Sequence, residues 1–331
     1  MKEEDAMEGL RPFRMDDIAA VIPLIAACED VDRSGAMPNE EGLRHQIAFP
    51  GIEVEQHVFV LPDANGALIA CVGAIPIPGP DRITCQVLLL VHPEYRPQGL
   101  QDTLLEWLES HAAQWCAQTQ SQGVLHTGVQ AQQQHYLDLY ARHGYQAVRW
   151  FLELERDLSL PVTDVPAPAG LHIRTMDPET DTQAYYVALT ESFQDHWDPH
   201  ELTLEQITHL LSSPSFRPDL TLLAFAEDGE PAGVCAGQDR EQHNQQHGTQ
   251  EGYISTVGVR RPFRRRGLAR ALLARSMRLL QEADRTVAVL HVDADSPTGA
   301  TRLYESVGFT ERKRSMILEK PVGTGAAMTE G

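Results

Sequence analysis

The chain has 331 residues, of which 42% are hydrophobic and 22% are charged, and its formal net charge is −20 at pH 7. At about 100–200 residues per domain this length favours two domains, and the composition excludes a disordered chain. No apolar run approaches the ~20 residues of a membrane-spanning helix, the acidic start MKEEDAMEGL lacks the apolar stretch of a secretory signal, and an acidic surface repels nucleic acids and anionic membranes.

The first half of the chain predicts a hairpin, a strand that turns into a helix, and a closing helix. VFVLPDANGALIACVGA, residues 58–74, reads as two strands joined at an Asn65-Gly66 turn. VLLLVHPEYRPQGLQDTLLEWL follows from residue 87, and LDLYARHGY closes this half at Tyr145. We therefore expect a compact α/β unit here.

PVTDVPAPAG, residues 161–170, separates this half from the next. Its three prolines and terminal glycine continue neither a helix nor a central strand. We expect an N-terminal domain over residues 1–160, a linker over 161–170, a C-terminal domain over 171–320 and a flexible tail over 321–331.

The second half repeats the elements of the first in the same order. The hairpin is repeated in TLLAFAEDGEPAGVCAG, and the strand, turn and helix are repeated in ISTVGVRRPFRRRGLARALL. The closing helix is repeated in TRLYESVGF. These landmarks recur about 163 to 168 positions apart, which indicates two copies of one α/β unit. QDREQHNQQHGTQE, residues 238–251, has no apolar periodicity and predicts an exposed hairpin loop.

Cysteine and histidine usage favours a cytoplasmic protein without a metal. The five cysteines are scattered and form no CxxC pair, which predicts reduced, mostly buried thiols. His243 and His247 are four residues apart, as are His196 and His200, but neither pair lies in a carboxylate signature. We therefore expect no bound metal.

An arginine-rich turn is the strongest candidate site. Five arginines fall within Arg260–Arg266, between a short apolar strand and a helix with apolar residues at helical spacing. A helix N-terminus exposes unpaired amides and the positive end of the helix dipole, so it binds phosphate. Gly267 allows close backbone approach, and the small Ala269 leaves room above the first turn. A solvated basic helix face is the alternative, above all for Arg270, Arg275 and Arg278.

The motifs around this turn resemble those of the GCN5-related N-acetyltransferases, the GNAT superfamily. RRRGLA, residues 264–269, resembles that family's Q/R-x-x-G-x-G/A pyrophosphate loop, and STVGVRRPF is similar to its fourth strand. HVDADSPTGATRLYESVGF, residues 291–309, resembles the following strand, helix and closing signature. Both halves match by element order and the second also by motif, and SFQDHWDP, residues 192–199, is similar to the mycothiol synthase-like two-domain type.

The resemblance implies two tandem acyl-CoA N-acyltransferase (GNAT) domains, each a mixed, mostly antiparallel central sheet flanked by helices. It also implies acetyl transfer from acetyl-CoA to a primary amine of a small molecule or peptide, possibly a cationic one. A split between the fourth and fifth strands would admit the pantetheine arm. The implied acetyl-CoA residues are Val257, Gly258, Val259, Arg264, Arg265, Arg266, Gly267, Leu268, Ala269, Arg270 and Ser296.

Tyr304 is the candidate general acid. The family signature places this hydroxyl near the CoA sulfur, where it would protonate the departing thiolate. The residue also falls on the apolar stripe of its helix, so core packing is the alternative. Ser296 predicts the N-cap of this helix and Pro297 its first position. Many relatives carry an asparagine near this helix start, and Ser296 is shorter.

Two acidic groups are candidates on the acceptor side. Glu251 shares a strand face with Tyr253 and would remove the amine proton through a water chain. The alternative is a surface acid at the end of a loop. Asp195, His196 and Asp198 form a second polar cluster that would hold a cationic acceptor, or that belongs to an ordinary helix–loop surface.

The first half departs from the pyrophosphate pattern. In RPQGLQ, residues 96–101, Pro97 has no amide to donate and Gln101 replaces the small residue, although Tyr140 still matches Tyr304 in position. We expect this domain to have a weakened or lost CoA site and to help wall the acceptor pocket.

Other functions stay open at this point. A CoA-binding pseudoenzyme with a regulatory or scaffold role is the main alternative to the enzyme. The net charge of −20 opposes nucleic-acid binding through the arginines, and no G-x-G-x-x-G motif follows a strand. The acceptor is open, and so is the choice between a monomer whose tandem domains mimic a dimer and a homodimer.

Overall fold

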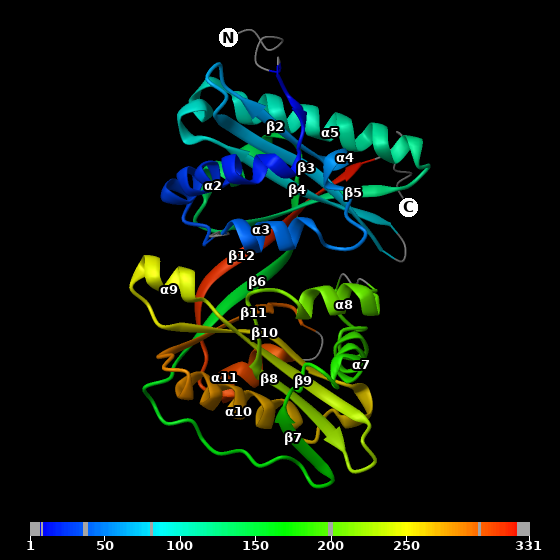
Figure 1. The fold of residues 1–331 in the computed structure, drawn as a ribbon, viewed down its shortest axis with the longest axis vertical. Coiled ribbons are helices and arrows are strands. Elements are labelled where there is room, and N and C mark those ends of the chain that lie inside the picture. The colour runs from blue at the N-terminus through cyan, green and yellow to red at the C-terminus, as the bar shows by residue number, and fades with distance from the viewer. Residues whose placement is uncertain are drawn as a thin grey trace. The chain divides into compact units, whose positions relative to one another are not determined.

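The computed structural model describes residues 7, 9–35, 39–79, 82–197, 201–296 and 299–322 (Figure 1). The chain divides into two compact units, Met1–Val148 with Met316–Gly331, and Arg149–Ser315. The division differs from the expected limits at residues 160 and 171, and the expected linker lies inside the second unit. Of the expected tail 321–331, residues 321 and 322 end a strand and the others lie outside the described residues.

The first unit consists of a six-stranded sheet with helices on both faces. Its sheet order is β1-β2-β3-β4-β5-β12, with β4 and β5 parallel. Its elements are β1 (Arg11–Pro12), η1 (Met15–Asp17), α2 (Ile18–Asp32), α3 (Glu40–Ile47), α4 (Val54–His57), β2 (Val58–Pro62), β3 (Leu68–Pro78), β4 (Ile83–Val91), η2 (Pro93–Gln98), α5 (Leu100–Gln118), β5 (Gly123–Gln130), α6 (Gln134–Arg142) and the end of β12 (Thr310–Val322).

The second unit repeats this plan. Its sheet order is β6-β11-β10-β9-β8-β7, with β10 and β11 parallel. Its elements are most of β6 (Gln146–Asp157), β7 (Leu171–Thr175), α7 (Thr182–Ser192), α8 (Leu204–Leu211), β8 (Phe216–Ala226), β9 (Pro231–Asp239), α9 (Glu241–His247), β10 (Glu251–Val259), η3 (Arg261–Phe263), α10 (Leu268–Glu282), β11 (Val287–Asp293) and α11 (Ala300–Ser306).

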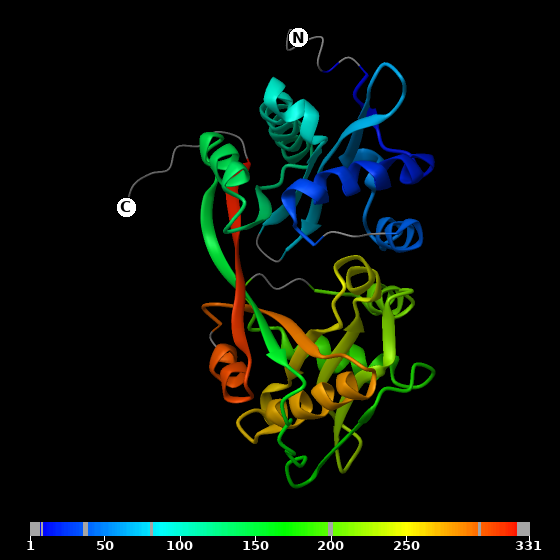
Figure 2. The same cartoon turned by 90° about the vertical axis from the view of Figure 1, so that its left-hand side faces the viewer.

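Each sheet buries both of its faces, because alternate side chains along a strand point to opposite sides. On β8, Leu222 and Ala224 pack in the cluster that contains the apolar face of α10, whereas Leu223 and Phe225 pack with α7 and α8. In the first unit, Ala70 and Val72 of β3 pack with α5, and Cys71 packs with α2. In the second unit α10 lies across one face of the sheet (Figure 2).

The last strand of each half joins the other half's sheet. β6 follows the last helix of the first half but pairs with β11 of the second, with Asp157 opposite Val287 and Phe151 opposite Asp293. β12 follows the last helix of the second half and lies beside β5 in the first sheet. This exchange is the physical reason for the difference in unit limits, and periodicity along the chain carries no signal for it.

Two local expectations were wrong. Residues 241–247 form the helix α9 rather than an exposed loop, because the buried Asn244 side chain ties it down: its amide nitrogen donates to the Glu251 carbonyl over 2.8 Å, and its carbonyl oxygen accepts from the Glu251 amide over 2.8 Å. Helix α11 begins at Ala300 with Gly299 as N-cap, not at Ser296. Pro297 lies outside the described residues.

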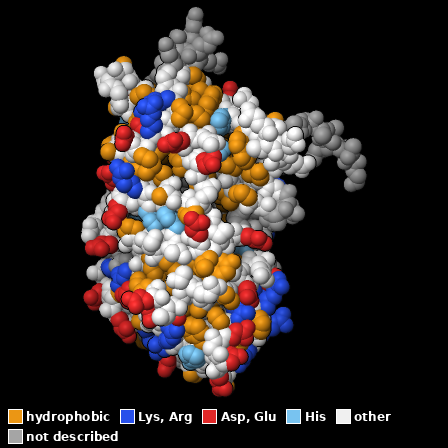
Figure 3. All heavy atoms as spheres, turned by 45° about the vertical axis from the view of Figure 1, so that its right-hand side comes forward, with side chains coloured by type: hydrophobic (Ala, Val, Ile, Leu, Met, Phe, Trp, Pro, Cys, Tyr) orange, Lys and Arg blue, Asp and Glu red, His pale blue; other side chains and the backbone are white. Residues whose placement is uncertain are grey.

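The state of the cysteines and the distribution of surface charge agree with what the composition predicts. All five cysteines are free and buried, as expected. Lys and Arg side chains lie interspersed with Asp and Glu on the face seen in Figure 3. Among the described residues no helix is both long and apolar enough to cross a bilayer.

Candidate active site

The two parallel strands at the centre of the second unit, β10 and β11, are paired along only part of their length. β10 and β11 pair from Glu251 opposite Val287 to Ile254 opposite Leu290, and the pairing stops there. β10 continues to Val259 bound to β9 on its other side. The edge of residues 255–259 that faces β11 therefore lacks a strand partner, and an extended ligand arm can pair with its N–H and C=O groups.

A β-bulge explains the divergence. The register of β10 against β9 shifts between Ile254 and Thr256, so Ser255 is the extra residue. A bulge bends the bulged strand and increases its twist. β11 carries no such shift against β6, with His291 opposite Glu153 and Val292 opposite Leu152. The bulge thus turns β10 away while β11 runs on straight.

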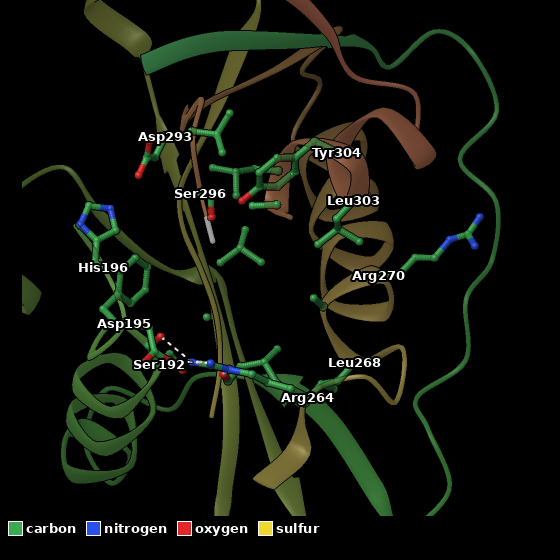
Figure 4. A pocket seen from close by; sticks show the side chains of 18 of the residues that line it. Ser192, Asp195, His196, Arg264, Leu268, Arg270, Asp293, Ser296, Leu303 and Tyr304 are labelled. Atoms are coloured by element: carbon green, nitrogen blue, oxygen red, sulfur yellow. Dashed lines mark hydrogen bonds and ion pairs between the residues drawn. The ribbon is translucent and has the colours of Figure 1, made fainter. Parts of the chain in front are cut away.

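The opening leads into a cavity of about 880 Å³ within the second unit (Figure 4). Its walls come from the open part of β10, the start of α10, the end of β11, the start of α11 and the loop after α7. All but one of the implied acetyl-CoA residues line it, and so does the candidate acid: Val257, Gly258, Val259, Arg264, Arg265, Gly267, Leu268, Ala269, Arg270, Ser296 and Tyr304.

The start of α10 presents free amides to this cavity. Arg265 (φ 61°) and Gly267 (φ 89°) both adopt the left-handed conformation, which bends the chain sharply into the helix. A Cβ at Gly267 would meet no atom within 4 Å, so the space above the bend is open. No backbone hydrogen bond links the amides of residues 265–269 to another described residue. Unpaired amides at a helix N-terminus suit an anion such as a diphosphate.

The arginines of the turn divide into two groups. Arg264 holds the turn together: its Nε donates to the Val259 carbonyl over 2.9 Å, and its guanidinium pairs with Asp195 at 2.6 Å. The side chain of Arg266 donates to the Ala169 carbonyl over 2.7 Å and does not line the cavity, so only its backbone amide is left for the implied contact with acetyl-CoA. Arg265 and Arg270 are exposed at the cavity and form no ion pair with another described residue, and their charges are therefore available to a phosphate.

Asp195 lies in the cavity wall, but its carboxylate forms ion pairs with two arginines. It pairs with both Arg261 and Arg264, and these two hydrogen-bonded guanidinium groups hold the pKa of its carboxyl far below the ordinary value. Its charge is thus already compensated by the two arginines, and its expected role as a holder of a cationic acceptor stays a prediction. His196 also lines the cavity, and Asp198 lies outside the described residues.

Tyr304 fits the role of a proton donor. It is 7% exposed, packs edge-on against Phe309 at 6.0 Å between ring centroids, and points its hydroxyl into the cavity (Figure 4). Burial raises the pKa of the Tyr304 phenol, and the nearby Cys235 and Tyr253 raise it further. The hydroxyl therefore stays protonated at neutral pH, as an acid in this place requires.

The structure places Glu251 away from the cavity lining. It is buried at the start of β10, where Arg240 Nη1 lies 3.0 Å and Arg312 Nη1 lies 2.6 Å from its carboxylate oxygens. Glu251 is thus a buried ion-pair residue, so the alternative of a surface acid at the end of a loop is wrong. Its expected role as a base stays a prediction, and its place outside the described lining does not support that role.

Two polar residues of the cavity wall had no role in the sequence analysis. Asp293 is held by Arg149, whose Nε and Nη2 donate over 2.8 and 2.7 Å. His291 also lines the cavity, and its partner Glu153 comes from the exchanged strand β6. Because that strand belongs to the other half of the sequence, spacing alone gave no signal for the pair.

The first unit has the same framework, with larger side chains at two of the matching positions. β4 and β5 also stop pairing early, at Gln86 opposite His126. Arg96 repeats Arg264: it donates to the Val91 carbonyl over 2.9 Å and pairs with Asp32 at 2.6 Å. Tyr136, which matches the small Ala300 by position, donates to Asp32 over 3.0 Å and lies beneath the Arg96 guanidinium.

Gln101 is the second of these larger side chains. It occupies the place of Ala269 after the turn, is 8% exposed, and leaves its Nε2 without a described partner. The first unit thus has two large side chains where the second unit has two alanines.

Replacing Gly258 with alanine should destabilise the second unit by about 1–3 kcal/mol, the usual result of overpacking a well-packed interior. An added Cβ would lie 2.8 Å from Cβ of Ser192, so α7 and β10 would have to separate. The free energy of unfolding from urea titration measures the loss. Gly128→Ala on β5 is the control, because its Cβ would approach a described atom only at 3.8 Å and should change stability by less than about 0.5 kcal/mol. Equal stability of the two variants would contradict this packing.

Known acetyltransferases match both halves of the chain. Residues 182–309 match the acetyltransferase (GNAT) family, and residues 54–147 match an acetyltransferase (GNAT) domain. A mycothiol acetyltransferase of Kineococcus radiotolerans is 31% identical over 309 residues, which are 92% of this chain and 93% of that protein. One of Salinispora arenicola is 28% identical over 93% of this chain and 95% of that protein.

A solved structure has a similar fold. A GCN5-related N-acetyltransferase of Sphaerobacter thermophilus superposes with a TM-score of 0.70 at 29% identity, over 96% of this chain and 97% of that chain.

Among the described residues no cluster of three or more His, Cys, Asp or Glu side chains is placed to hold a metal ion.

Proposed function

The chain belongs to the acetyltransferase (GNAT) family and is an N-acetyltransferase, and we propose that its second unit alone binds acetyl-CoA and passes the acetyl group to a primary amine of a small molecule. The observation that carries the proposal is one cavity that combines three parts. These are the unpaired edge of residues 255–259, the amide bend at Gly267 and the hydroxyl of Tyr304.

The residues of this cavity suit each part of the coenzyme. The amides of residues 265–269, with the charges of Arg265 and Arg270, would hold the diphosphate. Val257 and Val259 would pair with the pantetheine arm through their open backbone groups. Ser296 lines the same cavity. Acetyl-CoA supplies an activated thioester, and the chain supplies orientation and proton transfer.

Tyr304 is proposed as the group that gives a proton to the leaving sulfur. Its protonated hydroxyl lies in the wall of the cavity, so it can donate without first taking up a proton. Proton donation to a leaving group contributes about 10²- to 10⁴-fold to a rate. The pseudoenzyme alternative is disfavoured because this donor is retained at the cavity.

The acceptor is proposed to be a small amine that binds without a dedicated carboxylate partner. Both carboxylates in the described lining, Asp195 and Asp293, are paired with arginines. The name of the relatives makes mycothiol without its acetyl group the first acceptor to test. The five free, buried cysteines suit a reducing compartment, so a cytoplasmic location is proposed as well.

Isothermal titration with acetyl-CoA should give one equivalent bound per chain. The second unit has the open cavity, whereas Gln101 and Tyr136 occupy the matching space in the first. Two equivalents of similar affinity would overturn the assignment to one unit. Release of free thiol with a panel of small amines, de-acetylated mycothiol included, tests the transfer, and binding without any release would favour the pseudoenzyme.

A further inference from the structure

A histidine with partners on both ring nitrogens lies in the wall of the cavity. His291 on β11 faces Glu153 on the neighbouring β6, with Nε2 3.2 Å from Oε2. Its Nδ1 lies 3.0 Å from the hydroxyl of Tyr253 on β10. The His291 side chain is 40% exposed and lines the cavity, whereas Glu153 behind it is 11% exposed.

The first unit contains the same pair in a closed form. His126 on β5 lies 2.7 Å from Glu319 on β12, and the two side chains are 6% and 15% exposed. Arg82 donates to both oxygens of that carboxylate, over 2.9 and 2.8 Å. The buried pair His126–Glu319 of the first unit, the closed pair, thus links two strands. The pair His291–Glu153 of the second unit is more exposed, and its histidine faces the cavity.

The ring of His291 lies beside an ionised carboxylate, that of Glu153. Burial alone would raise the pKa of Glu153, but the hydrogen bond with His291 and the positive charges of His291, Lys313 and Arg312 outweigh it and lower that pKa. Glu153 therefore stays ionised beside the ring. The titratable and charged groups around His291, Glu153 and Tyr253 are Glu155 on β6, Arg240 before α9, Asp293 on β11, and Arg312 and Lys313 on β12.

We propose that His291 is the general base that removes the proton from the acceptor ammonium, with Tyr253 as the relay and Glu153 as the positioning residue. The inference rests on the proposed function of the second unit. An N–H bond of the ammonium breaks and its proton passes to the Tyr253 oxygen. The hydroxyl proton of Tyr253 passes in the same step to Nδ1 of His291. The products are a neutral amine, an unchanged tyrosine and an imidazolium that later releases its proton to water.

The other polar groups at the cavity are less suited to this step. Asp195 and Asp293 are each bound by arginine, and two guanidinium groups lower the pKa of the Asp195 carboxyl. Glu251 is buried between Arg240 and Arg312. A neutral imidazole has a free lone pair on one ring nitrogen and can accept a proton there.

His291→Gln should lower kcat/KM for the acceptor by about 10²-fold, the size expected for loss of a general base, while the Kd of acetyl-CoA stays within about twofold. The wild-type rate should rise with pH as the imidazole loses its proton, and His291→Gln should lose this acid limb. Free imidazole should restore part of the rate to His291→Ala, which a merely structural role would not allow. His126→Gln in the closed pair is the matched control, and it should keep the wild-type pH profile.

Glu153→Gln gives a readout that does not depend on turnover. Removing the carboxylate makes the imidazolium less stable, so the pKa of His291 followed by NMR titration of its ring protons should fall, and the acid limb should move to lower pH by the same amount. Tyr253→Phe should lower kcat without a change in acetyl-CoA binding.

Two results separate this inference from the proposed function. An active wild type whose His291→Gln variant keeps both rate and pH profile would overturn the assignment of the base alone. A wild type that neither binds acetyl-CoA nor acetylates any amine would overturn the function itself. If His291→Gln fails to fold, imidazole rescue of His291→Ala and the NMR shift in Glu153→Gln decide the question.

Discussion

Replacing Ala300 with tyrosine should weaken acetyl-CoA binding by roughly 100-fold or more, which corresponds to about 2.7 kcal/mol. The first unit shows what a tyrosine does at this position, since Tyr136 reaches across to Asp32 at 3.0 Å and lies beneath Arg96. Asp195 and Arg264 stand in the matching places of the second unit, paired at 2.6 Å. The new ring would therefore occupy the cavity and take the volume that the coenzyme needs.

Titration calorimetry of the purified variant measures this loss directly. Ala300→Ser is the control, because its side chain stays small and should bind acetyl-CoA like the wild type. Thermal unfolding of both variants shows whether the fold is kept. A folded Ala300→Tyr protein that binds one equivalent at wild-type affinity would contradict the placement of the coenzyme in this cavity.

The sequence predicted those parts of the fold that depend on local pattern. The hairpins at residues 58–74 and 221–237 and the helix after Gly267 are all present, because turn residues and apolar periodicity act over a few residues. The split between β10 and β11 was implied by the family resemblance, and it is present. The bulge at Ser255 that opens this split was not predicted, because the apolar run of residues 254–259 contains no residue pattern that marks a bulge.

Interactions between residues far apart in the chain could not be predicted from the sequence. The pairing of Arg264 with Asp195 joins residues 69 positions apart and turns two candidate binding groups into a brace. The exchange of β6 and β12 brings Glu153 next to His291 from the other half of the chain. Glu251 was chosen by its place on a strand, but its neighbours Arg240 and Arg312 come from other elements. Spacing reveals which residues share a face, not which charges neutralise one another.

The two units differ by side-chain volume rather than by framework. Both keep the parted strands, the arginine that donates to the end of the central strand, and the aspartate that holds it. Gln101 and Tyr136 in one unit and Ala269 and Ala300 in the other then decide whether a cavity remains. Duplication thus preserved the fold in both copies, and a few substitutions separate the proposed catalytic copy from the filled one.

Tyr304→Phe should lower kcat by about 10²-fold and leave the Kd of acetyl-CoA within about twofold. The phenylalanine keeps the ring contact with Phe309 at 6.0 Å, so the fold and the cavity should persist. What disappears is a hydroxyl that burial keeps protonated inside the cavity. The departing thiolate would then leave without a proton donor, and the loss would fall on the chemical step rather than on binding.

The acidity of the leaving thiol provides the sharper version of this test. A thioester whose thiol has a lower pKa needs less help from an acid, so the Tyr304→Phe defect should shrink as the leaving-group pKa falls. Tyr140→Phe in the first unit is the matched control: that tyrosine is 3% exposed within the core of its unit, and its loss should leave kcat unchanged. A defect in Tyr304→Phe of the same size for every thioester would assign Tyr304 to positioning instead of proton donation, and an unchanged kcat would remove it from the reaction.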